Sequence, residues 1–401
     1  MSRCIGPEKF LGFKSSYTSV SAQGSGYYDP RQCNAPRAWL FSSFFGNAAG
    51  LSACKGEAEV SEGQEQLSWL AGILKCDATD LAVQLVAGDA SPRKFYRISG
   101  PAPGSRVLMV SPPSENNERF VLIQRALERA GVRVPSMPRA NLALGYFLLE
   151  DLGDTTFALA LEQRDVDALY QEALDTLIAI RAIRTVESEL PHYDQKEFQR
   201  ELDVCPEWFF SKALSLPSDN KAVSVFAELS SCVIEAAHHQ PQGFVHRDYH
   251  SRNLMVSAGD ASLAVIDFQD AIVGPVVYDA ASLLKDVYVV WPREKQLVWL
   301  EYYWERLVRE GQLDEVSWPQ FIVWYDLISL QRHVKILGVF SRLWLRDDKP
   351  GYMRDIPVVI AYIRETCHLY CETYPAVGAF WDWFADSVMP TIARQDWYSA
   401  S

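Results

Sequence analysis

The chain has 401 residues, of which 48 % are hydrophobic, so it can bury a large core. Its formal net charge is -13, and a surface of this charge repels phosphate backbones, so we expect no nucleic-acid partner. No apolar run reaches the roughly 18 residues that a membrane helix needs, so we also expect no membrane partner.

The first 66 residues differ in composition from the rest of the chain. They are rich in Ser, Gly and Ala and show no sustained helical or strand period, a pattern typical of disordered segments. We expect residues 1–66 to be a disordered or non-native extension. Helical spacing begins with Leu67, Leu70 and Leu74.

The next segment predicts a small lobe rich in strands. Strands are expected at 82–86, 95–98, 107–110 and 146–149, with one helix at 118–130. A short turn joins the first two strands, which therefore form a hairpin. We assign residues 67–150 to this N-terminal lobe.

The remainder of the chain is mainly helical. Helices are expected at 155–184, 194–215, 219–239, 278–290, 293–310, 318–345 and 354–373, and two short strands at 253–256 and 263–266. We assign residues 151–390 to this C-terminal lobe. The predicted fold class is α+β with two lobes, and a ligand is expected in the cleft between them.

Two features bear on the cellular compartment. The 8 cysteines are scattered, without a CxxC pair or zinc-ligand spacing, which suits a reducing compartment. Residues 38–54 resemble the apolar part of a signal sequence, but they begin far from Met1, and the start of the chain lacks the usual basic region followed at once by an apolar run. We expect a cytoplasmic protein.

The strongest chemical signal is the segment His246-Arg-Asp-Tyr-His-Ser-Arg-Asn253, which contains the pattern H-R-D-x-x-x-x-N. Phosphoryl transfer needs a carboxylate to orient and deprotonate an acceptor hydroxyl, and oxygen ligands for Mg²⁺. Asp248 is placed for the first task and Asn253 for the second. Asp267 follows a hydrophobic strand, where its carboxylate can also bind Mg²⁺. His246 is expected to be a packed structural residue.

The three residues Asp248, Asn253 and Asp267 are informative as a set. Each one alone could be a turn residue, a loop residue or the end of a strand. Their order, their spacing and the flanking strands together favour a phosphotransferase.

These segments resemble the aminoglycoside-phosphotransferase-like superfamily, distant relatives of protein kinases, over about residues 67–370. The resemblance is strongest to bacterial N-acetylmuramate/N-acetylglucosamine anomeric kinases of cell-wall recycling. It implies a bilobal protein-kinase-like fold, ATP and Mg²⁺ as cofactors, and phosphorylation of the anomeric hydroxyl of a small amino sugar, with no obligate protein partner. The matching stretches are 88–91 with Arg93 and Arg97, 148–153, 246–253, 265–270, 274–279 and 331–335.

The same resemblance implies two contacts with the nucleotide. The lobe connector, with Glu150 and Leu152, would bond the adenine edge through its backbone. A turn of small residues would cover the phosphates, because its N–H groups can cradle an anion. This turn consists of Gly88, Asp89, Ala90 and Ser91.

The strand at 107–110 lacks the lysine that protein kinases use to pair with the nucleotide phosphates. Arg93 and Arg97 on the preceding strand could supply the positive charge, because strand alternation places both on one face. Each could instead be a solvated surface arginine.

The acceptor site is less clearly marked. A sugar that bears a lactyl carboxylate would favour a nearby cation, and a bidentate arginine suits that task, although helical cations are commonly just solvated. Asp279 is expected to be a helix N-cap. The candidates for acceptor binding are His250, Arg252, Asp270, Arg332 and Lys335.

Two other functions stay open at this point. The acceptor could be an aminoglycoside, choline or another metabolite, and an excess of acidic side chains in the acceptor cleft would favour a cationic aminoglycoside. The chain could also be a pseudokinase that serves as a binding module. The missing strand lysine favours that alternative, whereas the intact base and metal residues argue against it.

Overall fold

The computed structural model describes residues 56–87, 92–101, 103–184, 189–257 and 262–398. The chain divides into a unit at Met1–Gly63 and a compact unit at Gln64–Ser401, and the lobes below belong to the second. No helix in the described part of the chain combines the length and apolar character that crossing a bilayer requires.

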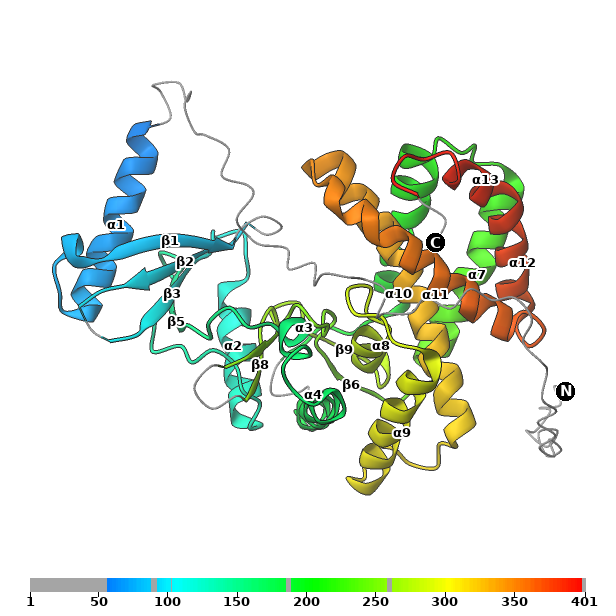
Figure 1. The fold of residues 1–401 in the computed structure, drawn as a ribbon, viewed down its shortest axis with the longest axis horizontal. Helices are drawn as coiled ribbons and strands as arrows, with labels where there is room; N and C mark the ends of the chain where they lie inside the picture. Colours follow the sequence, from blue (N-terminus) through cyan, green and yellow to red (C-terminus); the bar gives the residue numbers. More distant parts are fainter. Residues whose placement is uncertain (1–55, 88–91, 102, 185–188, 258–261, 399–401) are drawn as a thin grey trace, which may run out of the picture. The chain divides into compact units, whose positions relative to one another are not determined.

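The N-terminal lobe is built on a five-stranded antiparallel sheet in the order β1-β2-β3-β5-β4 (Figure 1). Every strand predicted in this lobe is present, and the short edge strand β4 is an addition. Its residues Arg, Ala and Asn include no β-branched or aromatic side chain, so the sequence did not indicate β4. The strands are β1 (Ala82–Ala87), β2 (Lys94–Ser99), β3 (Ser105–Val110), β4 (Arg139–Asn141) and β5 (Tyr146–Glu150).

Helices cover both faces of this sheet. Leu70 of α1 (Gly56–Leu74) packs with Leu108 and Leu148 on one face. The other face contacts α2 (Asn117–Arg129), whose first turn is capped by the Asn116 side chain. Helix α1 begins at Gly56, so the helical segment starts within the predicted extension and earlier than Leu67. A short 3-10 helix η2 (Ala78–Asp80) leads into β1.

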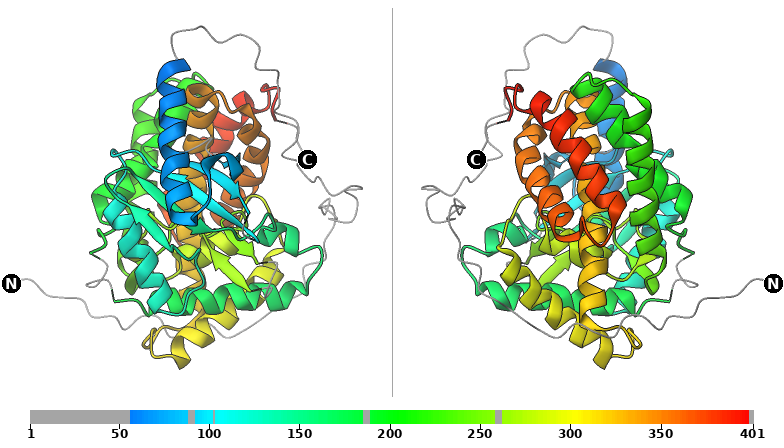
Figure 2. Two further views of the ribbon diagram at one scale, coloured as in Figure 1. Left: turned by 90° about the vertical axis from the view of Figure 1, so that its left-hand side faces the viewer. Right: turned by 90° about the vertical axis from the view of Figure 1, so that its right-hand side faces the viewer.

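The C-terminal lobe is mainly helical, with two short strand pairs. β6 (Gln242–Val245) pairs with β9 (Ile272–Pro275), and β7 (Leu254–Val256) pairs with β8 (Leu263–Val265). Figure 2 shows α7 beside α12 in this lobe. The helices are α3 (Phe157–Ala160), α4 (Val166–Arg181), α6 (Gln195–Leu202), α7 (Asn220–His238), α8 (Tyr278–Leu284), α9 (Arg293–Arg309), α10 (Trp318–Asp347), α11 (Ile356–Tyr370), α12 (Pro375–Trp383) and α13 (Met389–Ile392), with a 3-10 helix η4 (Pro350–Asp355) and π-helices η3 (Cys205–Ala213) and η5 (Phe384–Val388).

Several expected elements of this lobe were wrong in detail. The helix expected at 155–184 is interrupted, because Asp165 caps a new helix start. The helix expected at 194–215 changes to a π-helix at Cys205. There α10 approaches so closely that a Cβ on Gly338 would lie 2.4 Å from the backbone of Val204. Strands β6 and β9 were not predicted, because their pairing partner lies far away in the sequence.

The fold positions the candidate site between two cores. One large apolar cluster fills the C-terminal lobe and extends under the α2 face of the sheet. A separate small cluster contains Leu152, Met255 and Ala264, with Ile266 packed against it. It lies where the lobe connector meets the β7–β8 pair. The described cysteines are all free thiols.

Candidate active site

The loop that carries the predicted base connects β6 to β7, and hydrogen bonds within the loop contribute to its shape. Asp248 is half-buried near the middle of the loop. Its carbonyl oxygen accepts from the His250 N–H at 3.1 Å and from the Asn253 Nδ2 at 2.9 Å. Arg247, directly before Asp248, has a φ of 80°, a left-handed conformation that non-glycine residues rarely adopt. Such strain is frequent at functional sites.

Asp267 lies opposite this loop, after β8. The Asn253 Nδ2 is 3.3 Å from Asp267 Oδ2, and the Gln269 Nε2 donates to Asp267 Oδ1 at 2.7 Å. Asp267 also has a left-handed backbone, with φ of 64°. The two short strand pairs therefore bring all three residues of the predicted set to one place. Asp267 is exposed, so its carboxylate is accessible to a ligand.

His246 and Asp279 are buried residues that form hydrogen bonds beside the loop. His246 is fully buried, and its Nε2 lies 3.0 Å from the Ile266 carbonyl oxygen, as expected for a packed structural residue. The carboxylate of Asp279 accepts from the backbone N–H groups of His246 and Arg247 at 2.7 and 3.0 Å. The N-cap expectation for Asp279 was wrong, because Val277 is the N-cap and Asp279 lies in the first turn of α8.

The charges around Asp248 favour its ionised form. Burial alone would raise its pKa, but Lys335 and His250 lower it. Arg332 and His246 act in the same direction. The net pKa is below the usual range, so Asp248 is a carboxylate at neutral pH and can accept a proton.

Two of the acceptor candidates lie on α10 and bond to protein groups. Arg332 donates to the Arg247 carbonyl at 2.9 Å and to the Ser282 hydroxyl at 2.5 Å. The Lys335 ammonium lies 2.8 Å from Glu201 of α6. Neither is a solvated surface cation.

Of the other acceptor candidates, His250 and Arg252 lie in the loop, and Asp270 lies between β8 and β9. The His250 ring nitrogen is 3.5 Å from the Asn253 Nδ2. The Arg252 guanidinium lies 3.4 Å from the centre of the Tyr288 ring, a cation–π contact. Asp270 is exposed and interacts electrostatically with Arg119 of α2.

On the nucleotide side, the predicted turn at 88–91 lies outside the described residues, and Arg93 and Arg97 differ from each other. Arg93 is only 4 % exposed, bonds to the Ser111 hydroxyl at 3.2 Å and pairs with Glu115 at 3.3 Å. The alternative that Arg93 is a solvated surface arginine is therefore wrong.

Arg97 binds the lobe connector. Its Nε and Nη2 donate to the two carboxylate oxygens of Asp151 at 2.6 and 3.0 Å, and it also pairs with Asp154. The surface alternative is wrong here as well, since a bidentate pair fixes the guanidinium. The structure gives Arg97 a direct role in fixing the connector.

The connector is fixed from its other side as well. Arg133 pairs with both oxygens of Glu150 at 2.7 and 2.6 Å, and the Ser136 backbone exchanges hydrogen bonds with Glu150. Leu152, two residues further along, belongs to the small apolar cluster with Met255. An apolar surface of this kind can pack against the flat ring of a nucleotide.

Sequence reasoning missed three residues of this region. Arg119 of α2 donates to the Ala271 carbonyl. Arg247 and Glu201 form a buried ion pair under the loop. Arg247 was within the recognised motif, whereas Glu201 carried no signal, since a helical glutamate is usually solvated.

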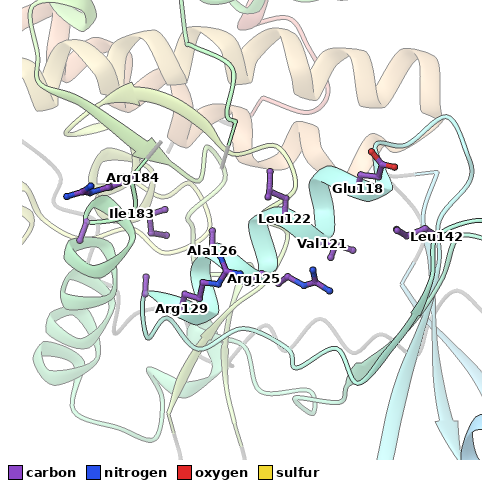
Figure 3. Close-up of a pocket in the computed structure, with 11 residues that line it drawn as sticks. Glu118, Val121, Leu122, Arg125, Ala126, Arg129, Leu142, Ile183 and Arg184 are labelled. Atoms are coloured by element: carbon purple, nitrogen blue, oxygen red, sulfur yellow. The ribbon is translucent and has the colours of Figure 1, made fainter. Parts of the chain in front are cut away.

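Helix α2 also contacts the segment around Asp267 through an aromatic ring. Phe120 stacks on Phe268, next to Asp267, with ring centroids 5.1 Å apart. A hollow of about 570 Å³ lies beside the same helix and the end of α4 (Figure 3). Its lining includes Arg125, Arg129 and Arg184 but none of the predicted site residues. It is therefore separate from the candidate active site.

The chain has the protein-kinase-like fold, with a strand-rich lobe, a connector and a helical lobe. The loop of Asp248 in the helical lobe is typical of a phosphotransferase with this fold. The family model described as "Phosphotransferase enzyme family" matches residues 82–316. The chain belongs to this family, and the predicted fold class and enzyme class are confirmed.

Individual relatives agree with this assignment. The chain is 37 % identical over 281 residues to the N-acetylmuramate/N-acetylglucosamine kinase of Pseudomonas aeruginosa, an alignment covering 69 % of this chain and 81 % of the relative. It is 36 % identical over 279 residues to the kinase of the same name from Pseudomonas putida, with 70 % and 81 % covered. A solved ethanolamine kinase from Plasmodium vivax superposes with a TM-score of 0.56 at 13 % identity, covering 82 % of this chain and 92 % of that one. This last likeness concerns the fold alone.

Proposed function

We propose that this protein is an ATP-dependent kinase that transfers the γ-phosphoryl group of ATP to the anomeric hydroxyl of N-acetylmuramate and N-acetylglucosamine. The observation that carries the proposal is the convergence of Asp248, Asn253 and Asp267 on two facing loops. The names of the Pseudomonas relatives support the acceptor class.

Asp248 is the base in this proposal. Its carboxylate accepts a hydrogen bond from the sugar hydroxyl and takes the proton as the hydroxyl oxygen bonds to the γ-phosphorus. The bond from that phosphorus to the bridging oxygen breaks, which leaves ADP and the sugar 1-phosphate. The lowered pKa of Asp248 keeps it ionised for this task.

Mg²⁺ fits the donor set of Asn253 and Asp267. The Asn253 Nδ2 is used within the site, so its amide oxygen is the atom that a cation would take. Mg²⁺ usually takes one or two protein oxygen ligands and keeps waters and phosphate oxygens for the rest, and when bound here it would neutralise charge on the transferring phosphate.

For the nucleotide, we propose that adenine packs against Leu152, Met255 and Ala264 while the connector backbone bonds its edge. Arg93 is the proposed cation near the phosphates, because it is buried and its guanidinium lies 5.7 Å from the centre of the Phe120 ring, which stacks on Phe268. The turn at 88–91 stays a prediction. Because the proposed reaction consumes ATP, we also propose that the protein works in the cytoplasm.

The charges at the acceptor side support an amino sugar over a polycationic aminoglycoside. Lys335 and Arg332 both carry a positive charge that acts on Asp248, and a polycation would meet repulsion there. The acceptor proposed here is neutral or carries one carboxylate, which avoids that repulsion.

An ADP-release assay with Mg-ATP across amino sugars, an aminoglycoside and choline tests this proposal. Turnover is expected with N-acetylmuramate and N-acetylglucosamine only. Asp248→Ala should lower kcat at least about a hundredfold, and Asp267→Asn should remove Mg²⁺-dependent turnover. A thermal-shift titration with Mg-ATP checks nucleotide binding separately. Binding of Mg-ATP without any turnover would favour the pseudokinase alternative.

A further inference from the structure

The residue before the proposed base is held in an unfavourable conformation. The left-handed backbone of Arg247 persists only if its surroundings determine it fully. The direction of the Asp248 side chain depends on this conformation, because the two residues share a peptide bond. The groups that hold Arg247 therefore also set the position of Asp248.

Arg247 is held through both its backbone and its side chain. Its backbone N–H donates to Asp279, and its carbonyl oxygen accepts from Arg332 at 2.9 Å. Its guanidinium pairs with Glu201 and lies 3.3 Å from Glu197. Three different helices contribute these contacts, so the conformation is determined by tertiary structure.

Glu201 is the centre of the side-chain contacts. It is 4 % exposed, and one of its oxygens accepts from both Arg247 and Lys335 while the other accepts from the Tyr193 hydroxyl. A buried carboxylate is stable only when it is paired. Burial would raise the pKa of Glu201, but the positive charges of Lys335 and Arg247 outweigh it and lower that pKa to about 2.

We propose that Glu201, Lys335 and Arg332 are positioning residues that hold Arg247 in its left-handed conformation and thereby aim Asp248 at the acceptor hydroxyl. This inference rests on the proposed function, since it takes Asp248 as the base. It gives Arg332 and Lys335 a task different from acceptor binding. Their side chains contact the loop and its supporting helix, so they act through another residue.

The expected signature is a change in rate without a change in binding. Loss of the pairing lets Asp248 leave its productive geometry, and such misplacement lowers kcat. In steady-state assays of the full chain, Glu201→Gln and Lys335→Met should each lower kcat at least about tenfold. KM for ATP, N-acetylmuramate and N-acetylglucosamine should stay within about twofold of wild type.

Two further variants test the mechanism of the effect. Lys335→Arg keeps the positive charge and should restore most of the kcat lost in Lys335→Met. The double variant Glu201→Gln/Lys335→Met should lose little more than either single variant, because the pair acts as one unit. If Glu201→Gln does not fold, the Met and Arg variants of Lys335 carry the test.

The matched control is Arg293→Gln. Arg293 is 19 % exposed and lies 2.6 Å from the fully buried Asp326, whereas Lys335 is 18 % exposed and lies 2.8 Å from Glu201. Arg293→Gln should lower the melting temperature as the Lys335 variant does, but it should leave kcat within about twofold of wild type.

Several results would overturn the inference. A KM that rises for N-acetylmuramate but not for N-acetylglucosamine in Lys335→Met would make Lys335 a ligand of the carboxylate. An equal loss of kcat in Arg293→Gln would show general destabilisation. If the wild-type protein is active and Glu201→Gln has the same kcat, this inference alone is refuted. If the wild-type protein releases no ADP with any amino sugar, the proposed function is refuted as well.

Discussion

Replacing His333 with Gln should make the stability of the protein less sensitive to acid between pH 7 and pH 5. His333 is buried in α10, its ring stacks on Tyr362 at 4.7 Å, and its Nε2 lies 3.1 Å from the Lys285 carbonyl. Burial and the positive charge of Lys285 lower its pKa to about 3. The folded protein therefore keeps this imidazole neutral at pH 5.

The magnitude follows from the difference between the pKa values of the folded and unfolded chains. The unfolded chain protonates His333 near the ordinary histidine pKa of 6.5, and the folded chain does so only near 3. Stability is therefore fully present above pH 6.5 and falls as the pH drops toward 3. The loss is about 1.4 kcal/mol per pH unit below pH 6.5, so the roughly 1.5 units from there to pH 5 remove about 2 kcal/mol.

The assay is urea unfolding of both proteins at pH 7, 6 and 5. Gln keeps an N–H donor and does not titrate, so the other groups contribute equally and cancel in the comparison. We expect the wild-type free energy of unfolding to fall by about 2 kcal/mol more than that of His333→Gln. Parallel curves for the two proteins would refute the reasoning.

Two further substitutions follow from close contacts in the structure. Gly338→Ala should destabilise the protein by at least about 2 kcal/mol in urea unfolding, because the new Cβ would lie 2.4 Å from a backbone carbon. The control Gly72→Ala, with open space around it, should be neutral or stabilising. An equal loss of stability in the two variants would contradict the steric explanation. Arg97→Gln should raise KM for ATP at least about fivefold, because Asp151 loses two charge-assisted bonds. The control Arg306→Gln breaks an ion pair in which the arginine has similar exposure, and it should leave KM for ATP unchanged. If KM for ATP is also unchanged in Arg97→Gln, Arg97 has no role in holding the connector.

Local patterns predicted much of the fold. Strands β1, β2, β3 and β5 follow from alternation, and helices α2, α7, α9 and α10 follow from helical spacing. These elements are long or strongly patterned. Strands β4, β6 and β9 were missed for two reasons. β4 contains no β-branched or aromatic residue, whereas β6 and β9 each contain a glycine and pair with each other across about 30 residues of sequence.

The π-helix η3 shows the same limit. Its sequence has ordinary helical spacing, and the change of hydrogen-bonding pattern coincides with the close contact to Gly338 on another helix. Pro206 at the start of η3 has no backbone N–H and marks an interruption of the α-helix, but it does not by itself indicate that a π-helix follows.

The class of enzyme could be predicted from local sequence. The order and spacing of Asp248, Asn253 and Asp267 predict phosphoryl transfer, because that reaction needs a base and oxygen ligands for a metal. The partners of the surrounding charges, in contrast, are known only from the folded chain. Arg97 pairs with the connector, and Lys335 pairs with Glu201. A long cationic side chain carries no local signal of its partner, and only the packing of distant helices and strands selects that partner.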